Sequence, residues 1–348
     1  NKQLLVDTKY YDYVRRTDRS YSDLLIDLLK VQPRQPDIPL EVGKKNFETY
    51  ANIASSAQKI LEELLFLILQ HAHDITKEKK FLFSGGVAMN SAAVSKCSKL
   101  DFINELNIPP SPGDSGAAIG AACFGFINHN KKNLNNSILK EKITNNLFPG
   151  KIKSSEDFFE LVFDKIADVK TSINKVSELI AENEIVATCY GNIETGPRSL
   201  GHRSLLCNAH NSELIKKLST EIKKRNLFRP TAPVILKEYA NKYFHLENSL
   251  MNCYLHMGST AIPKADISKD IKGVIHADNT SRIQICNEDQ LLGKILTNLK
   301  KYNIFLIANT SFNISSDPMV YDKEDAFLAT ERMNIKYLLT ERGLFKRK

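Results

Sequence analysis

The sequence has no hydrophobic run long enough to cross a membrane, and its first residues show no signal-peptide pattern. Its longest apolar stretch, Leu61 to Leu69, contains Glu62 and Glu63. That stretch is far shorter than the roughly 20 apolar residues that a membrane-spanning helix needs. The amino terminus shows no charged segment followed by an apolar one, as a secretory signal would. We therefore expect a cytoplasmic protein that has no membrane partner.

Paired cysteines are also missing. The six cysteines are scattered, and no two of them form a C-x-x-C pair. This spacing excludes the usual zinc site and gives no reason to expect a disulfide framework. The chain has no internal repeat and no coiled-coil segment either. Reduced, mostly structural cysteines are the expectation that follows.

What the chain does contain is typical of a globular protein with two domains. It has 348 residues, of which 42% are hydrophobic and 25% are charged. Such a length exceeds that of one ordinary domain, and this composition supplies enough apolar side chains for two cores. The net charge of +8 favours anionic ligands without saying which anion.

A strand-to-helix turn rich in glycine follows the first long helix. Apolar residues recur at helical spacing from Tyr50 to Gln70, and Phe81–Phe83 is typical of a short buried strand. Gly85, Gly86 and Asn90 then precede a helix, where backbone amides are exposed to a nucleotide phosphate or ribose. A plain tight connection remains the alternative.

Asp114 lies in a second turn of this kind, Gly113-Asp114-Ser115-Gly116, before a helix of small residues. An aspartate between glycines can approach a metal ion or a metal-bound polyphosphate without crowding. The alternative is that Asp114 caps the helix that follows. Both readings are compatible.

A segment poor in apolar residues divides the chain at about residues 128–155, and it predicts a linker. Beyond it, apolar runs of strand type alternate with amphipathic helical stretches, which indicates a mixed α/β domain. The expected strands cover residues 185–190, 234–236, 273–276, 282–285 and 304–308, and the expected helices 176–181, 214–222 and 289–299.

Cations gather in two short runs of this second domain, Gly196–Ser204 and Ile222–Pro230. Arginine grips phosphate oxygens with a planar fork of donors, and lysine adds a compact charge. Glycine, proline, leucine and phenylalanine interrupt the charges, which favours an enclosed anion pocket over a solvated basic surface. The candidate catalytic residues are Arg198, Arg203, Lys223 and Arg229.

Polar side chains at a strand end complete the candidate site. Asn309, Ser311 and Asn313 follow the expected strand at residues 304–308, where ligand sites of α/β sheets commonly lie. Local turn formation is the alternative for these residues. Arg282 adds a further cation after a polar turn. We predict that these four residues bind the nucleotide or acyl phosphate.

These motifs resemble, in the same order, those of the NodU/TobZ-type O-carbamoyltransferases. The resemblance rests on the segments 53–58, 84–90, 113–116, 190–204, 222–230, 309–313 and 318–320 and covers nearly the whole chain after about Phe47. It implies an α/β fold: the carboxy-terminal part of an actin/hexokinase-like (Kae1-like) ATPase domain within residues 1–150, with the linker at its end, followed by a YrdC-like mixed α/β domain at residues 170–348.

The resemblance also implies a reaction. The YrdC-like domain combines ATP with carbamoyl phosphate to form carbamoyl adenylate, releasing pyrophosphate and phosphate. The Kae1-like domain then transfers the carbamoyl group to a hydroxyl of a small molecule or sugar. Mg²⁺ is expected with the ATP. The resemblance allows a homodimer, and a nucleic acid partner is not expected.

A metal site is implied too, with Asp114 and two histidines of an H-x-x-x-H helix holding Fe²⁺ or a similar divalent ion. No H-x-x-x-H is present in the chain, so we expect that it begins inside the first domain. Two alternatives stay open. A nucleic-acid-binding or tRNA-modification-related module predicts steeply salt-dependent RNA affinity. An interaction protein with an inactive nucleotide site predicts ATP binding without turnover.

Overall fold

The structure, a computed structural model, divides into two compact units, Asn1–Ala57 and Gln58–Lys348. It describes residues 7–12, 14, 18–35, 38, 40–129, 163–226, 228–229, 231–314 and 317–348. The predicted linker lies outside these residues from position 130 onward. The predicted domain boundary between residues 150 and 170 therefore stays a prediction. Among the described residues, no helix combines the length and apolarity needed to cross a membrane.

The first unit contains little regular structure. It comprises the 3₁₀ turn η1 (Thr8–Tyr10), the helix α1 (Asp23–Leu29) and the beginning of the long helix α2 (Lys45–Thr76). Lys30, which caps the carboxyl end of α1, has left-handed backbone angles. The Tyr50 hydroxyl donates to the Gln32 carbonyl at 3.1 Å. No residue proposed for the site belongs to this unit.

The second unit begins with a small lobe around a parallel pair of strands. The predicted helix is confirmed here as α2. The predicted strand is found as β1, but it is not buried as expected, because Lys80 and Leu82 are exposed and Phe81 is half-buried. Apolar side chains of α2, α3 and β2, among them Leu65, Val94 and Leu106, are buried in the core of the lobe. Its elements after α2 are β1 (Lys80–Leu82), η2 (Gly86–Met89), α3 (Ser91–Cys97), β2 (Glu105–Asn107) and α4 (Ser115–His129).

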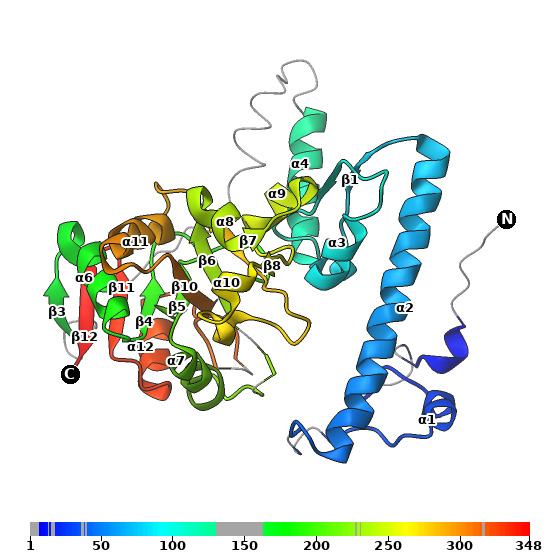
Figure 1. The fold of residues 1–348 in the computed structure, drawn as a ribbon, viewed down its shortest axis with the longest axis horizontal. Coiled ribbons are helices and arrows are strands. Elements are labelled where there is room, and N and C mark those ends of the chain that lie inside the picture. Colours follow the sequence, from blue (N-terminus) through cyan, green and yellow to red (C-terminus); the bar gives the residue numbers. More distant parts are fainter. Residues whose placement is uncertain are drawn as a thin grey trace. The chain divides into compact units, whose positions relative to one another are not determined.

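A mixed eight-stranded sheet organises the rest of the unit (Figure 1). The strands lie in the order β3-β12-β11-β4-β5-β10-β6-β9. The pairs β11–β4 and β6–β9 are parallel, and the other five neighbouring pairs are antiparallel. The strands are β3 (Phe163–Ala167), β4 (Val186–Cys189), β5 (Arg203–Asn208), β6 (Ala232–Leu236), β9 (Gln284–Cys286), β10 (Leu306–Ser311), β11 (Tyr337–Thr340) and β12 (Gly343–Arg347).

Helices and short strands fill the connections of this sheet. The helices are α6 (Val169–Ala181), α7 (Ser212–Lys217), the π-helix η5 (Leu218–Ile222), α8 (Lys237–Tyr243), α9 (Met251–Tyr254), α10 (Ala265–Ser268), α11 (Leu291–Leu299) and α12 (Lys323–Arg332). The 3₁₀ turns are η6 (Asn248–Leu250), η7 (Lys272–Val274) and η8 (Lys300–Tyr302). A small separate hairpin pairs β7 (Phe244–His245) with β8 (Ile262–Pro263).

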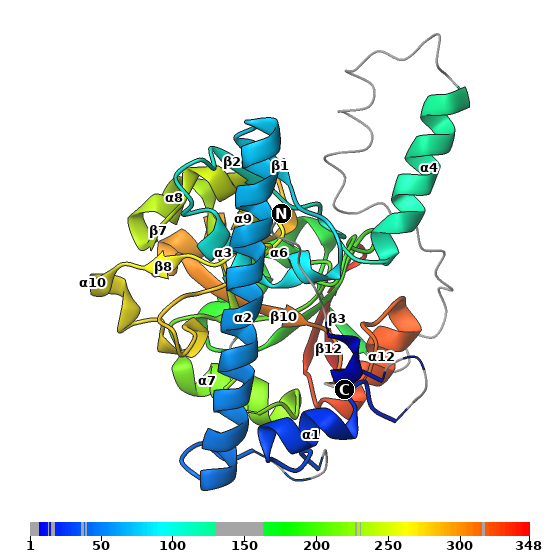
Figure 2. The ribbon, with the colours of Figure 1, turned by 90° about the vertical axis from the view of Figure 1, so that its right-hand side faces the viewer.

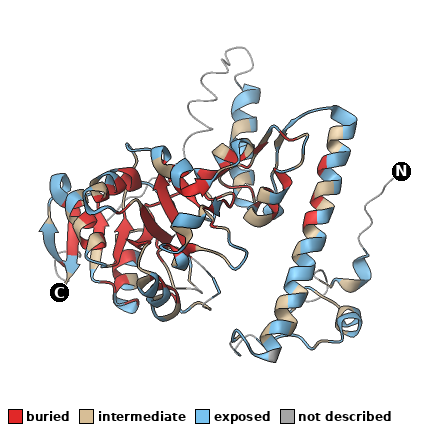
Figure 3. Cartoon of the chain, in the orientation of Figure 1, coloured by how far each residue is buried: buried red, intermediate tan, exposed pale blue. Residues whose placement is uncertain are grey.

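Both faces of the sheet are covered, as the side-chain alternation along each strand shows. On β5, Leu206 packs with α6 and α11 on one face, whereas Leu205 and Cys207 belong to the core of the other face. The helices α6 and α11 lie side by side on the first face, away from α7 and α12 (Figures 1 and 2). Buried residues concentrate on the strands (Figure 3). The sheet is therefore a rigid base for groups at its edges.

One expectation about this domain needs correction. Residues 273–276 do not form a strand, because Lys272–Val274 is the 3₁₀ turn η7. Gly273 packs so closely on Ile215 that an added Cβ would lie 2.8 Å from its Cδ1 atom. The sequence analysis also did not anticipate β5, which begins inside the cationic run at Arg203, nor the hairpin of β11 and β12.

Candidate functional site

The chain topology brings four segments of the second domain to one edge of the sheet. Strand β10 runs antiparallel to β5 and β6, so its carboxyl end lies beside their amino ends. In this register Ser311 pairs with Ser204, and Asn309 pairs with Ala232. Strand β9 runs parallel to β6 and starts just after Arg282. Residues far apart in the sequence therefore surround one space.

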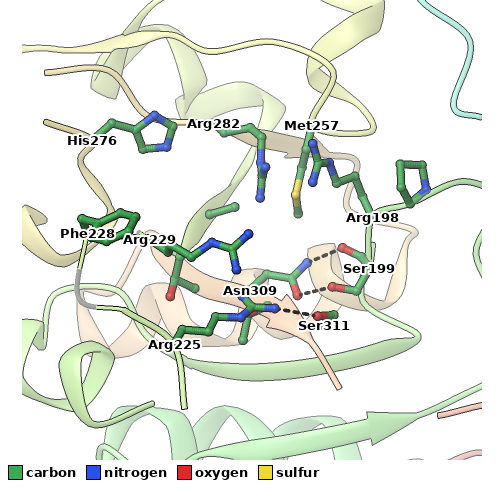
Figure 4. A pocket seen from close by; sticks show the side chains of 14 residues that line it. Arg198, Ser199, Arg225, Phe228, Arg229, Met257, His276, Arg282, Asn309 and Ser311 are labelled. Atoms are coloured by element: carbon green, nitrogen blue, oxygen red, sulfur yellow. Dashed lines mark hydrogen bonds between the residues drawn. The ribbon is translucent and has the colours of Figure 1, made fainter. Parts of the chain in front are cut away.

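That space is a cavity of about 350 Å³ with arginines from three segments around it (Figure 4). Such a volume lies within the usual range of about 300–1,000 Å³ for small-molecule sites. No aspartate or glutamate is among the described residues that line the cavity. These lining residues are Pro197, Arg198, Ser199, Arg225, Phe228, Arg229, Thr231, Ala232, Met257, His276, Arg282, Asn309, Thr310 and Ser311.

The four arginines of this cavity, which we call the arginine cavity, repel one another. Burial, followed by the charges of Arg198, Arg225 and Arg229, lowers the pKa of Arg282 to about 9. Burial and Arg229 lower the pKa of Arg225 as well. The Nε atoms of Arg225 and Arg282 are buried and have no hydrogen-bond partner within the described structure. An anion would supply both the missing acceptors and the missing negative charge.

Asn309 and Ser199 connect β10 to the loop before β5. The Asn309 side-chain amide donates to the Ser199 carbonyl and to Gln284 Oε1, each at 3.0 Å. The Ser199 hydroxyl donates to Asn309 Oδ1 at 3.4 Å. Asn309 is thus held by protein partners on both sides and fixes the wall of the cavity near Arg198 (Figure 4).

Lys223 and Arg225 approach the end of β10 from the segment after η5. Arg225 donates from Nη1 to Thr310 Oγ1 at 3.2 Å and from Nη2 to Ser311 Oγ at 3.4 Å. Lys223 is buried under this contact and does not line the cavity. The Lys223 ammonium donates to the Ser311 carbonyl, to the Asn313 carbonyl at 2.5 Å and to Asn313 Oδ1 at 2.7 Å.

The protonation state of Lys223 follows from these contacts. Burial and the charge of Arg225 lower the pKa of Lys223. Lys223 contacts four oxygens on Ser311 and Asn313, the fourth being Ser311 Oγ at 3.2 Å, and the other three are carbonyl or amide oxygens, which only accept hydrogen bonds. Three such acceptors need three N–H donors, and only the ammonium form has them. We therefore take Lys223 as a charged group that holds the end of β10.

The loop that carries Arg198 and Ser199 is shaped by its glycines and by one carboxylate. Gly196 has a φ of +93°, and a Cβ there would lie 2.0 Å from the Pro110 carbonyl oxygen, so no other residue fits. The buried Glu194 accepts three backbone hydrogen bonds through Oε1, from Leu200, His202 and Arg203 at 2.8–2.9 Å. The carboxylate closes the loop around the cavity residues.

Replacing Glu194 with alanine is expected to destabilise the protein by about 3 kcal/mol, because three backbone donors lose their acceptor. Glu194→Gln keeps an acceptor oxygen and is expected to lose less than half as much. Urea denaturation measures both changes. Glu63→Ala removes an exposed glutamate and is the matched control. Equal stability of Glu194→Ala and the wild type would contradict the role given to Glu194.

Arg203, predicted as a catalytic residue, lies apart from the arginine cavity. Its guanidinium donates to four backbone carbonyls at 2.9–3.1 Å, those of Tyr190, Gly191, His202 and Tyr321. It borders a smaller cavity of about 60 Å³. These four acceptors are main-chain atoms, and Arg203 is not among the described residues that line the arginine cavity, so the structure does not bring it together with Arg198, Arg229 and Arg282.

The predicted phosphate-binding residues of the small lobe form a separate group. Gly85 donates to the Pro112 carbonyl at 2.7 Å and has a φ of +103°. Asn90 caps α3, accepting from the Ala93 amide at 3.1 Å, and exchanges hydrogen bonds with Gln58. Gly86 begins η2. None of these three lines the arginine cavity.

Asp114 is exposed at the start of α4, where its carbonyl accepts from the Ala117 amide at 3.0 Å. The described residues contain no group of three or more His, Cys, Asp or Glu side chains that is able to hold a metal ion. Asp114 therefore does not make a metal site with other described residues, and we derive no step through a metal there. Its assignment stays a prediction.

The sequence analysis missed Arg225 and Glu194. Arg225 lies two residues after Lys223 in the same cationic run, so its charge and position were visible in the sequence. Its direction was not, because a side chain in an irregular segment can face either way. Glu194 precedes the Gly196–Ser204 run and gives no sequence signal, since its partners are backbone amides.

Comparison with protein families matches most of the chain to two models. The model described as carbamoyltransferase N-terminus matches residues 23–123. The model described as carbamoyltransferase C-terminus matches residues 177–347, which include every residue of the arginine cavity.

Curated proteins with related sequences include nodulation proteins. The chain is 27% identical over 311 residues to nodulation protein NolNO of Sinorhizobium fredii, covering 84% of this chain and 44% of that protein. It is 29% identical over 279 residues to nodulation protein U of the same species, covering 76% and 46%. The chain thus spans about half the length of the curated relatives that it matches.

Solved structures with local similarity were also found. Full-length HypF in its phosphate- and nucleotide-bound form aligns with a TM-score of 0.38 at 22% identity, covering 53% of this chain and 23% of that one. P. abyssi Sua5 complexed with L-threonine aligns with a TM-score of 0.35 at 16% identity, covering 49% and 46%.

Proposed function

This chain belongs to the carbamoyltransferase family, and from that membership we propose that its arginine cavity binds ATP and carbamoyl phosphate and forms carbamoyl adenylate. The observation that carries the proposal is the cavity itself, in which four arginines converge and no acidic side chain of the described residues lines the wall. ATP and carbamoyl phosphate together bring many negative charges, and these arginines would balance them.

The proposed reaction consumes one water molecule, because its atoms balance only then. Carbamoyl phosphate and water give carbamate and phosphate. A carbamate oxygen then attacks the α-phosphorus of ATP, the bond between the α-phosphorus and the bridging oxygen breaks, and pyrophosphate leaves. Both steps build negative charge on phosphate oxygens. Preorganised arginines stabilise such charge without reorganisation during the reaction.

Individual residues have separate parts in this proposal. Arg198, Arg225, Arg229 and Arg282 bind the phosphates. Asn309 and Ser199 hold the cavity wall by their mutual hydrogen bonds, and Lys223 positions Ser311 and Asn313. Mg²⁺ bound to ATP would supply further charge neutralisation. All of these residues belong to the part of the chain predicted to be the YrdC-like domain.

We further propose that the carbamoyl group passes to a hydroxyl of a small molecule or sugar, as the family resemblance implies. Gly85, Gly86, Asn90 and Asp114 belong to the Kae1-like part proposed for that transfer. The chain spans about half the length of its curated relatives. We therefore propose the transfer step for the whole protein, of which this chain forms all or part.

The decisive test of adenylate formation is pyrophosphate release from ATP that depends on carbamoyl phosphate. Arg198→Ala is expected to lower kcat/KM by about 100-fold, the usual cost of removing one donor to a developing charge. Arg332→Ala, which removes an exposed arginine paired with Asp317, is the matched control. Release that does not require carbamoyl phosphate, or an unaffected Arg198 variant, would refute the proposal.

A further inference from the structure

His276 lies on the wall of the arginine cavity, close to Arg282 (Figure 4). A tight turn places it there: the His276 amide donates to the Thr280 carbonyl at 2.7 Å. Asn279 within the turn has a φ of +62°, a conformation that asparagine tolerates better than most residues. His276 is the one histidine among the described residues that line the cavity.

Hydrogen bonds in this turn decide which ring nitrogen carries a proton. The Thr280 hydroxyl donates to Asp278 Oδ1 at 2.7 Å, so its oxygen is left to accept. His276 Nδ1 lies 3.3 Å from that oxygen. Nδ1 is therefore assigned the proton in the neutral ring, and Nε2 has the free lone pair. Any further proton must bind at Nε2.

The charges around His276 oppose each other. Burial, the largest cause, lowers the pKa of His276, the Asp278 carboxylate raises it, and Arg282 lowers it. Arg198, from the loop before β5, and Arg225 and Arg229, from the segment after η5, contribute positive charge to the same cavity. Without an anion, the ring is surrounded by more positive than negative charge.

We propose that His276 is a fifth anion ligand of the arginine cavity, and that it takes up a proton at Nε2 when a polyphosphate binds. The anion neutralises the arginines, which weakens the repulsion of a charged ring. Its phosphate oxygens also accept a hydrogen bond, which offsets the cost of burying that charge. The proton comes from solvent, and no covalent bond changes. This inference rests on the proposed function in one respect, the choice of a polyphosphate as the anion.

The sign of the pH effect follows from this coupling. A group whose pKa is higher in the complex than in the free protein strengthens binding at low pH. That gain is lost as the pH rises through the pKa of the complex. One proton changes the association constant by at most about tenfold per pH unit. Phosphate affinity should therefore fall between about pH 6 and about pH 8, where histidine titrates.

Calorimetric titration with inorganic pyrophosphate, in buffers of different ionisation enthalpy, tests the inference. Pyrophosphate itself changes protonation in this range, so the difference between wild type and His276→Gln isolates the histidine. The affinity of the wild type should fall from about pH 6 to about pH 8 by roughly fivefold to tenfold more than that of the variant. His245→Gln, which removes an exposed histidine of β7, should behave as the wild type.

A second measurement does not depend on whether the variant folds. Long-range ¹H–¹⁵N NMR of the wild-type histidine rings should show one Nδ1–H imidazole whose titration moves to higher pH when pyrophosphate is added. If pyrophosphate binds and no ring behaves so, or if His276→Gln keeps the full pH dependence, the inference fails and the anion site stands. If pyrophosphate does not bind at all, the proposed function fails with it.

Discussion

Replacing Arg282 with methionine is expected to leave the free protein about as stable as the wild type while abolishing its stabilisation by pyrophosphate. Arg282 borders a cavity with three other arginines, and its Nε atom has no hydrogen-bond partner within the described structure. Replacing an uncompensated buried charge with an apolar side chain of similar length is often neutral or stabilising. The positive charge of Arg282 is also the group that we expect a bound pyrophosphate to contact.

The size of this effect can be estimated from mass action. Pyrophosphate at about 100 times its Kd stabilises the wild type by about 2.7 kcal/mol. For a protein of 348 residues that is a rise in Tm of about 4 °C, whereas the Arg282→Met variant should gain less than about 1 °C. Differential scanning calorimetry with and without pyrophosphate measures both values. Arg332→Met, at an exposed arginine, should keep the full rise.

The pH dependence of the free protein offers a further check on Arg282. Its pKa in the folded protein is lowered to about 9 from the ordinary value of 12.5. Below pH 9 it is charged in both the folded and the unfolded states, so the repulsion acts in full at neutral pH. Above pH 9 the unfolded chain binds more protons, and this contribution to stability rises with pH. A large Tm loss in Arg282→Met without ligand would contradict the repulsion.

Replacing Lys223 with methionine is expected to cost about 3 kcal/mol of stability, because three half-buried carbonyl or amide oxygens lose a charged donor. Those oxygens belong to Ser311 and Asn313 at the end of β10. Ser311 Oγ in turn accepts from Arg225. Carbamoyl-phosphate-dependent pyrophosphate release should therefore fall by about 100-fold, as Arg225 loses its fixed position.

Urea denaturation and the turnover assay measure these two losses, and Lys217→Met, at an exposed lysine of α7, is the matched control. Lys223 is not among the described residues that line the arginine cavity, so it acts through Ser311 and Asn313. Full stability of Lys223→Met together with lost turnover would contradict this positioning role and point to direct contact with substrate.

Much of the local structure could be predicted from the sequence. The helical spacing between Tyr50 and Gln70 predicted α2, and the apolar run at residues 304–308 predicted β10. The strand β10 is buried along nearly its whole length, whereas α2 buries Leu65 and Leu69 but leaves Ile60 and Ile68 of the predicted apolar face exposed. The strand β5 escaped prediction because its first residues, Arg203 and Ser204, are polar yet buried. Arg203 donates to the carbonyls of Tyr190, Gly191 and Tyr321, which come from other segments and are absent from a local pattern.

The sequence by itself determined which chemical groups the candidate site has: Arg198, Arg229, Arg282, Asn309 and Ser311 were identified from residue type and position, and all five line the arginine cavity. Only the tertiary structure decided how the remaining cations divide. Arg225 faces the cavity, Lys223 lies beneath it, and Arg203 donates to main-chain carbonyls elsewhere. The physical reason is that a side chain's charge is a property of its residue, whereas its direction depends on acceptors that folding brings from distant strands.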